Sequence, residues 1–296
     1  MTPRQSTALT MPRRFLPVVA PFLLVILVSS CDDGTTGPGS GVVDNTDFEA
    51  SASFRFTVPA DARSLLVVEG VTGSIKIAGV AESDTVVIIG CRRVKSESVA
   101  DAEAHLGDLQ VLVTSSGTRV DVTTQQPGDT HGRQYIVDYE IIIPASWETS
   151  AANVSGNVDV QSVAQDVTVR CTTGLVTVSD CTGDVEVDLT TGDIRLDGIH
   201  GSLDVEAVTG NVVAENYLPA GGVCEISLVT GAVTLEIPST TSATFSAKLV
   251  TGLITLIGVT LDGASISPTR VTGTLGSGNG RIDLEAITGA ITVTGF

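Results

Sequence analysis

The feature that most constrains this sequence is a nine-residue spacing of glycines across its centre. The glycines at 156, 174, 183, 192, 201 and 210 are separated by nine or eighteen residues. After each of them aliphatic residues alternate with polar ones, as in Val185/Val187 and Leu203/Val205. Alternation with period two predicts strands that bury one face. Nine residues suffice for one such strand and a tight turn.

The segments fall into two kinds that alternate along the chain. One kind has its third inward residue six positions after the turn residue, as in Leu189 and Ala207, and the other has it seven positions after, as in Cys181 and Ile199. The repeat is therefore eighteen residues long and holds two strands. Farther along the chain it lengthens to twenty-one, because Val-Thr-Gly recurs at positions 229, 250 and 271. A last copy follows at 280–293, and an earlier one lies at 66–77.

These repeats predict an all-β fold, a parallel β-solenoid with two strands per 18–21-residue coil. Each strand is too short to bury its face alone, but coils stacked at about 4.8 Å form a continuous core. Only 4% of the residues are aromatic, so Val, Ile, Leu and Ala must fill that core. A β-sandwich of antiparallel hairpins is the alternative, and the repeat region lacks the Asn-Gly turns typical of it.

The first fifty residues have the pattern of a targeting segment and a tether. Residues 1–30 carry three arginines and no acid, followed by an apolar run from Phe15 to Val28. This pattern is typical of a secretory signal peptide, and Leu27-Val28-Ser29-Ser30-Cys31 resembles a bacterial lipoprotein box. The resemblance implies lipidation of Cys31. Residues 31–50 are rich in Gly, Ser, Thr and Asp and are expected to be a flexible tether.

Residues 51–296 are expected to form a single solenoid domain, interrupted at 84–144 by an insertion with a different pattern. Within it, 84–95, 112–124 and 135–143 are predicted strands. The stretch 96–109 has apolar residues at helical spacing, with Ser98 and Asp101 in a capping-box relation. We expect this one short helix to cap the N-terminal end of the solenoid, whose strand edges would otherwise be open.

The ordered combination of these segments resembles the bacterial "putative adhesin" family of envelope β-solenoids, a domain of unknown function. The resemblance covers residues 52–296 and rests on Phe54-Arg-Phe-Thr-Val-Pro59, on the short helix and on Val137-Asp-Tyr-Glu-Ile-Ile-Ile-Pro144. It rests further on the Ser155-Gly156 repeats and on the ending from Gly273 to Leu284. The family has no agreed catalytic residues, so the resemblance implies an extracytoplasmic location and no catalytic set.

The chain carries a formal net charge of −18, which argues against nucleic acid as a partner because a polyanion binder needs a basic surface. No catalytic residues, zinc motif or cofactor motif are found. The expected register places acidic side chains together on the outer surface of neighbouring strands. These residues are Asp184, Glu186, Asp188, Asp204, Glu206 and Glu225. They are a candidate Ca²⁺ or cationic-ligand face, or a solvated surface that keeps an exposed sheet soluble.

Four cysteines follow Cys31, and the register turns Cys171, Cys181 and Cys224 inward at separations too large for bridging. No disulfides are therefore expected, and Cys91 is expected to be a free thiol as well.

These observations favour a non-enzymatic, lipid-anchored protein of the bacterial cell envelope. It would attach to a membrane through Cys31 and present a flat polar sheet, without a pocket, to an envelope glycan or protein. A structural or assembly module, or one that senses envelope stress, remains an alternative. A β-helical polysaccharide enzyme is weaker, because short turns leave no walls for a substrate groove.

Overall fold

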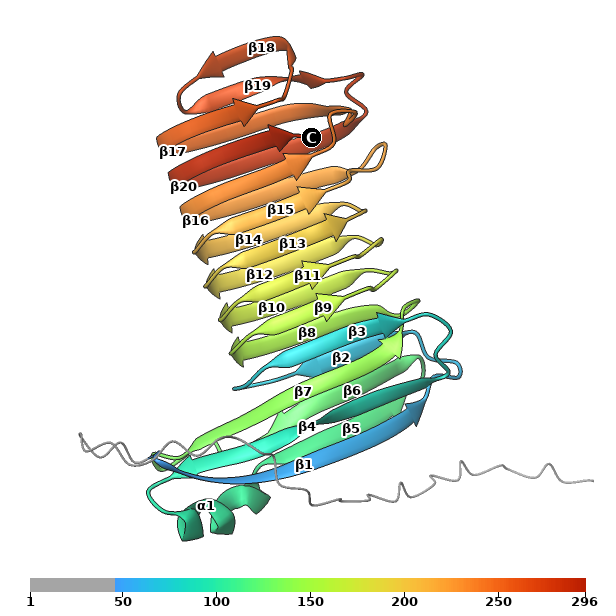
Figure 1. Ribbon diagram of the computed structural model, residues 1–296, viewed down its shortest axis with the longest axis vertical. Helices are drawn as coiled ribbons and strands as arrows, with labels where there is room; N and C mark the ends of the chain where they lie inside the picture. Colours follow the sequence, from blue (N-terminus) through green and yellow to red (C-terminus); the bar gives the residue numbers. More distant parts are fainter. Residues whose placement is uncertain (1–45) are drawn as a thin grey trace, which may run out of the picture.

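The computed structural model describes residues 46–296, so the predicted signal peptide and Cys31 lie outside the described residues. The described part is all-β with one short α-helix, as the sequence predicts, and it holds twenty strands. Figure 1 shows a tall stack of strands with α1 (Val99–His105) near one end and the β18 hairpin at the other. In the described part, no helix is long and apolar enough to cross a membrane.

The stack has two faces joined at sharp corners. Face A consists of β2 (Leu65–Glu69), β8 (Glu148–Ser155), β10 (Val167–Thr173), β12 (Val185–Thr191) and β14 (Leu203–Thr209). Face B consists of β3 (Ile75–Val80), β9 (Val158–Gln161), β11 (Val176–Ser179), β13 (Ile194–Ile199) and β15 (Val212–Asn216). Three longer strands turn the corner and belong to both faces: β16 (Val223–Ile237), β17 (Ala243–Ile257) and β20 (Gly280–Gly295).

Strands of one face pair in parallel, and equivalent residues of successive repeats stand side by side. Val187 pairs with Val169 on one side and with Val205 on the other, so the register advances by eighteen residues. All three side chains are fully buried between the faces. Burial of one such aliphatic side chain stabilises the fold by about 1.5–3 kcal/mol. The core is therefore a series of stacked aliphatic layers.

Glycine is required where face A turns into face B. At Gly192, Gly210 and Gly231 the backbone φ is +138°, +141° and +141°, a conformation that side chains rarely permit. A Cβ on Gly210 would lie 1.6 Å from the carbonyl oxygen of Gly192 in the preceding turn. The glycines thus let successive turns approach to strand-pairing distance at this corner.

At the C-terminal end the strands do not stack in chain order. The repeat predicts successive turns at 229, 250 and 271 and a final turn at 280–293. Instead, β20 lies between β16 and β17 and pairs in parallel with both, which places the C-terminus within the stack (Figure 1). The predicted turn at 271 is wrong: Val271 belongs to β19 (Arg270–Leu275), which runs antiparallel to β17 and pairs with β18 (Asp262–Ser267).

The N-terminal end is also built out of chain order. The turn made by β2 and β3 lies between β8/β9 and the pair β6 (Arg119–Gln125) and β7 (Gln134–Pro144). Beyond β7 the sheet continues antiparallel through β4 (Thr85–Ser96) to β1 (Phe48–Pro59), while β5 (Gln110–Ser116) forms a hairpin with β6. The predicted strands at 84–95 and 135–143 correspond to β4 and β7, whereas the predicted stretch 112–124 forms the two strands of the β5–β6 hairpin.

The helix α1 begins as its sequence predicts, but its capping is different. The Ser98 hydroxyl accepts a hydrogen bond from the Asp101 backbone N–H at 3.1 Å. The Asp101 carboxylate does not return the bond to Ser98. It accepts two bonds from Arg133, at 2.7 and 2.8 Å, and one from the Ser96 hydroxyl. These bonds lower the pKa of Asp101. The bonds from Arg133 also connect the helix to the segment that leads into β7.

The cysteines follow the predicted register with one exception. Cys171, Cys181 and Cys224 are buried free thiols among the inward aliphatic residues. Burial raises the pKa of Cys224 to about 12. Cys91, by contrast, is disulfide-bonded, so the expectation of no disulfide does not hold for this residue.

Candidate functional site: an acidic row and a groove along face A

The predicted acidic residues lie together on the outside of face A. Glu186 of β12 pairs with Asp204 of β14, and Asp204 pairs with Glu225 of β16. Asp188 and Glu206 form a second row two residues farther along the same strands. We call these two rows the acidic rows.

Asp184 has a structural role at the start of its strand. Its carboxylate accepts a hydrogen bond from the backbone N–H of Ser202 at 2.7 Å. Its own backbone N–H donates in the same way to the Asp166 carboxylate at 3.0 Å. The Asp184 side chain therefore accepts a hydrogen bond from the backbone of the next turn of the stack. It belongs to a series of such carboxylate-to-backbone hydrogen bonds between successive turns, and not to the acidic rows.

Arginines pair with the outer members of the acidic rows and leave the centre uncompensated. Arg170 contacts Glu186 at 2.5 Å and Asp188 at 3.0 Å. On the other side, Arg281 contacts Glu225 at 2.7 Å. Within the described chain no cation pairs with Asp204 or Glu206. Burial, and then the neighbouring carboxylates of Glu225, Glu206, Glu186 and Asp188, raise the pKa of Asp204.

Among residues 46–296 no group of three or more His, Cys, Asp or Glu side chains could hold a metal ion. A shallow hollow of about 320 Å³ lies over Glu186, Asp204 and Glu225. The geometry is that of an open acidic surface, and Ca²⁺ binding stays a prediction.

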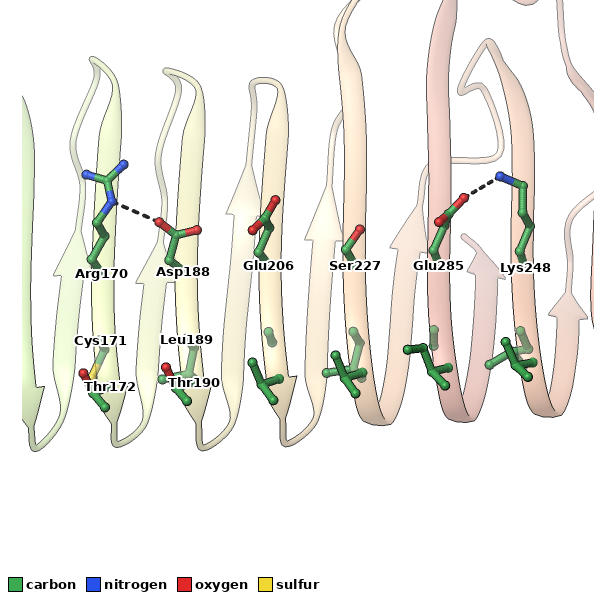
Figure 2. A pocket seen from close by; sticks show the side chains of 18 of the residues that line it. Arg170, Cys171, Thr172, Asp188, Leu189, Thr190, Glu206, Ser227, Lys248 and Glu285 are labelled. Atoms are coloured by element: carbon green, nitrogen blue, oxygen red, sulfur yellow. Dashed lines mark hydrogen bonds and ion pairs between the residues drawn. The ribbon is translucent and has the colours of Figure 1, made fainter.

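A groove with a volume of about 1220 Å³ lies beside the second acidic row. It runs along the stack and crosses β8, β10, β12, β14, β16, β20 and β17 at the point where each strand approaches the glycine corner. With strands about 4.8 Å apart, seven strands make it about 29 Å long. Figure 2 shows the groove from close by.

One wall of the groove is charged and polar. Figure 2 shows its residues in a single row in the order Arg170, Asp188, Glu206, Ser227, Glu285 and Lys248. The two ends of the row are cationic and the middle is acidic. Arg170 is paired with Asp188 and Lys248 with Glu285, and Arg270 of β19, the strand neighbour of Lys248, also lines the groove.

The floor and the other wall are mostly aliphatic. The floor is made of inward residues such as Leu189, Ala207 and Leu228. They are 3–7% exposed, whereas Val205 in the same strand as Ala207 is fully buried. We call the opposite wall the valine wall. Its apolar members are Val154, Val208, Val229, Ile287 and Val250, which are 41–71% exposed, and Thr172 and Thr190 complete the row.

The groove differs from the flat sheet that the sequence predicts. The signal in the sequence that could have found it is the valine of each Val-Thr-Gly corner. That valine follows an inward residue and precedes an outward threonine, so Val208 and Val229 had to be outside. An outward β-branched apolar residue repeated on several turns indicates an apolar ridge on the surface.

The histidines are not brought together. His105 lies in α1 next to Asp101, and His131 lies in an exposed turn. His200 stacks on Tyr217 with ring centroids 4.3 Å apart, and Tyr217 contacts Phe296 edge-on at 5.8 Å. This aromatic group covers a corner of the stack near the C-terminus.

Comparison with known families identifies the architecture. The Toastrack DUF4097 family model matches residues 56–294. The chain belongs to this family. The match covers nearly all of the described residues of this Toastrack protein. It agrees with the resemblance found in the sequence, and the family is a domain of unknown function.

Solved structures similar to this Toastrack protein are remote in sequence. A putative cell adhesion protein from Clostridium sporogenes is 12% identical; the match covers 83% of this chain and 100% of that one, with a TM-score of 0.32. A putative adhesin from Bacteroides fragilis is 9% identical over 82% of this chain and 97% of that one, with a TM-score of 0.29. Among curated proteins no match was found.

Proposed function

We propose that this protein is a non-enzymatic component of the bacterial cell envelope that binds another envelope component along face A. The observation that carries the proposal is the groove that crosses seven strands of the stack. Its walls are held in place by parallel pairing on both sides of nearly every strand that it crosses. β-Branched side chains with restricted χ1 line the valine wall, so little conformational entropy is lost on binding.

Anchoring forms the second part of the proposal. Residues 1–30 have the charge and apolar pattern of a signal peptide, and Cys31 follows a lipoprotein-like box. Lipid on Cys31 and a tether up to about residue 47 would hold the solenoid near a membrane while leaving face A accessible. Substituting Cys31→Ala in the full chain should move the protein from the membrane fraction to the soluble extracytoplasmic fraction.

The binding part is tested by co-sedimentation of the full chain, purified in detergent, with detergent-extracted envelope material. We expect the wild-type protein to sediment with this material and the double variant Val208→Asp/Val229→Asp to remain in the supernatant. Both valines are about half exposed, so the fold should survive, which circular dichroism would check. Val213→Asp is the matched control, because Val213 is similarly exposed (40%) but lies on face B. Equal sedimentation of both variants would contradict the proposal.

An assembly role is the second candidate, supported by apolar side chains at the far end of the stack. Val250, Leu253, Ile257 and Ile266 are 52–71% exposed and lie on β17 and β18, the last strands of the stack. Such a patch favours association with another subunit. Sedimentation velocity of the purified protein would show a concentration-dependent oligomer, and Ile266→Asp would abolish it.

A further inference from the structure

The two faces of the stack end at different levels at its C-terminal end. Face A continues past β17 with β19 and then β18, whereas face B ends with the second half of β17, from Leu253 to Ile257. Among residues 46–296, β18 pairs with no strand other than β19, so its outer edge is open. An open edge and uncovered apolar side chains favour association with another chain.

The side chain of Ile266 shows that β18 leaves half of a core layer uncovered. Ile266 stands directly opposite Val271 of β19, and opposite residues of an antiparallel pair point to the same side of the sheet. Val271 points into the core and is 1% exposed, whereas Ile266 is 69% exposed. The difference arises because Leu261 lies on the inward side of β19, against Gly273, while face B has no described strand opposite β18.

The other end of the stack offers no matching surface. There the last strand of face A is β5, and its inward residues Val111 and Val113 already pack against the core. On face B the last strand is β1, and α1 packs against it (Figure 1). Head-to-tail stacking of copies would therefore bring Ile266 against an end whose own core is already closed.

The C-terminal end of a second copy does match this surface. An overhanging half-layer fits the same half-layer turned over by a two-fold axis, so that Ile266 of one copy packs against Ile266 of its partner. Charge does not oppose this contact. Between Leu249 and Thr269 the only charged side chain is Asp262, in a chain whose formal net charge is −18. Farther down the stack, exposed acids such as Glu206 would repel a second copy.

We propose that two copies of this protein associate end to end through β18, with Ile266 of each copy in the shared contact, and that the two copies are anchored in facing membranes. This inference rests on the proposed lipid anchor and names the partner for the assembly role.

The dimensions of the stack connect this contact to two membranes. Twelve strands of face A, from β5 to β18, make the stack about 53 Å long at about 4.8 Å per strand. β1, which follows the anchor in the chain, lies at the end opposite β18 (Figure 1). An end-to-end pair therefore places its two anchors about 100 Å apart, on opposite sides of the contact.

Each single contact is expected to be weak. Two six-residue strands bury less than the roughly 1,200–2,000 Å² of a stable protein interface. Many copies on each of two facing membranes would add their contacts, which is how weak sites produce firm adhesion.

Cross-linking of the full chain, purified in detergent, tests the contact itself. A short bismaleimide should join Ile266→Cys into a dimer about tenfold faster than Val213→Cys, because two thiols in one contact meet at a high effective concentration. Val213 is the matched control, since it is also exposed but lies on face B in the middle of the stack. Equal rates for the two variants would overturn the inference, as would cross-linking of Ile266→Cys to Phe48→Cys in preference to itself.

Clustering of phospholipid vesicles tests the facing membranes. Flotation of the lipidated chain with the vesicles first tests the proposed anchor on its own. Vesicles that carry the wild-type chain or Val213→Asp should then cluster and scatter light, and those that carry Ile266→Asp should stay dispersed. Labelled bare vesicles should be left out of the clusters. Dispersed wild-type vesicles, clustering by Ile266→Asp or inclusion of bare vesicles would overturn the inference.

Failure of the groove as a binding site is a separate result. Val208→Asp/Val229→Asp lies away from β18 and should cluster vesicles as the wild-type chain does, whether or not it loses sedimentation with envelope material. Loss of clustering in this variant would contradict a contact made through β18.

Discussion

The glycine corner predicts a large and specific loss of stability on adding one methyl group. In Gly210→Ala the new Cβ would lie 1.6 Å from the Gly192 carbonyl oxygen, about 1.8 Å short of an ordinary 3.4 Å contact. The obstacle is backbone, so no side chain can rotate away. The backbone φ of +141° adds a conformational cost of about 1–3 kcal/mol. To relieve the clash, the two turns must also move apart, which weakens the hydrogen bonds that pair them. We therefore expect the free energy of unfolding to fall by more than about 4 kcal/mol.

Two other glycines separate the steric cost from the conformational one. Gly221 also has a positive φ, +80°, but a Cβ there would meet nothing within 4 Å. Gly221→Ala should therefore cost only about 1–2 kcal/mol. Gly107 has neither constraint, and Gly107→Ala should be neutral or stabilise by up to about 1 kcal/mol.

Urea unfolding of the three variants, followed by circular dichroism, would measure this order. Equal losses in Gly210→Ala and Gly221→Ala would refute the argument that close approach of successive turns, and not backbone conformation alone, requires glycine at this corner.

Three further predictions follow from the order of strands, the acidic rows and the buried thiols. A chain truncated before residue 280 would lose β20 and leave both β16 and β17 without their shared neighbour. We therefore expect this chain to aggregate or to lose its cooperative unfolding transition. If the turns stacked in chain order, the truncated chain would instead form a shorter, folded solenoid. Asp204→Asn should stabilise the protein at pH 7 by about 0.3–1 kcal/mol at low salt. Because the folded-state pKa of Asp204 is raised, its unfavourable contribution is present at neutral pH and disappears as the pH falls through that pKa; a gain that grows toward acid pH would contradict this sign. The thiols of Cys171, Cys181 and Cys224 should react with a maleimide only after unfolding, so peptide mass spectrometry should find each of the three labelled in denaturant and unlabelled in buffer.

Much of the fold can be predicted from the sequence because the repeat is local. Inward residues two apart, such as Val185 and Val187, specify which face of each strand is buried, and a one-residue slip would reverse every side chain. The same register predicts that Glu186, Asp204 and Glu225 lie side by side, and the strand pairing confirms it. The start of α1 is predictable too, since Ser98 has the side chain that a helix N-terminus needs.

The position of Asp184 and the groove are harder to predict. A carboxylate at a corner can point outward or along the stack. Asp184 points along the stack because its carboxylate accepts a hydrogen bond from the Ser202 backbone N–H at 2.7 Å, a contact that exists only in the folded stack. The groove depends on how the valine wall and the charged wall stand on either side of the partly exposed floor residues, which is a property of the folded stack. Alternation in the sequence shows which side a residue takes, but it does not show whether that side is flat or concave.

The sequence by itself determined that this chain forms stacked short strands with an aliphatic core, and which side chains of each strand face outward. Only the tertiary structure decided the order in which the turns stack. Every turn presents the same inward pattern and the same glycine corner, so β20 matches β16 and β17 as well as neighbours in the chain would. Local pattern cannot distinguish equivalent partners. The choice depends on which strands remain unpaired when the ends of the stack are closed, here by β18 and β19 at one end and by β1, β4 and α1 at the other.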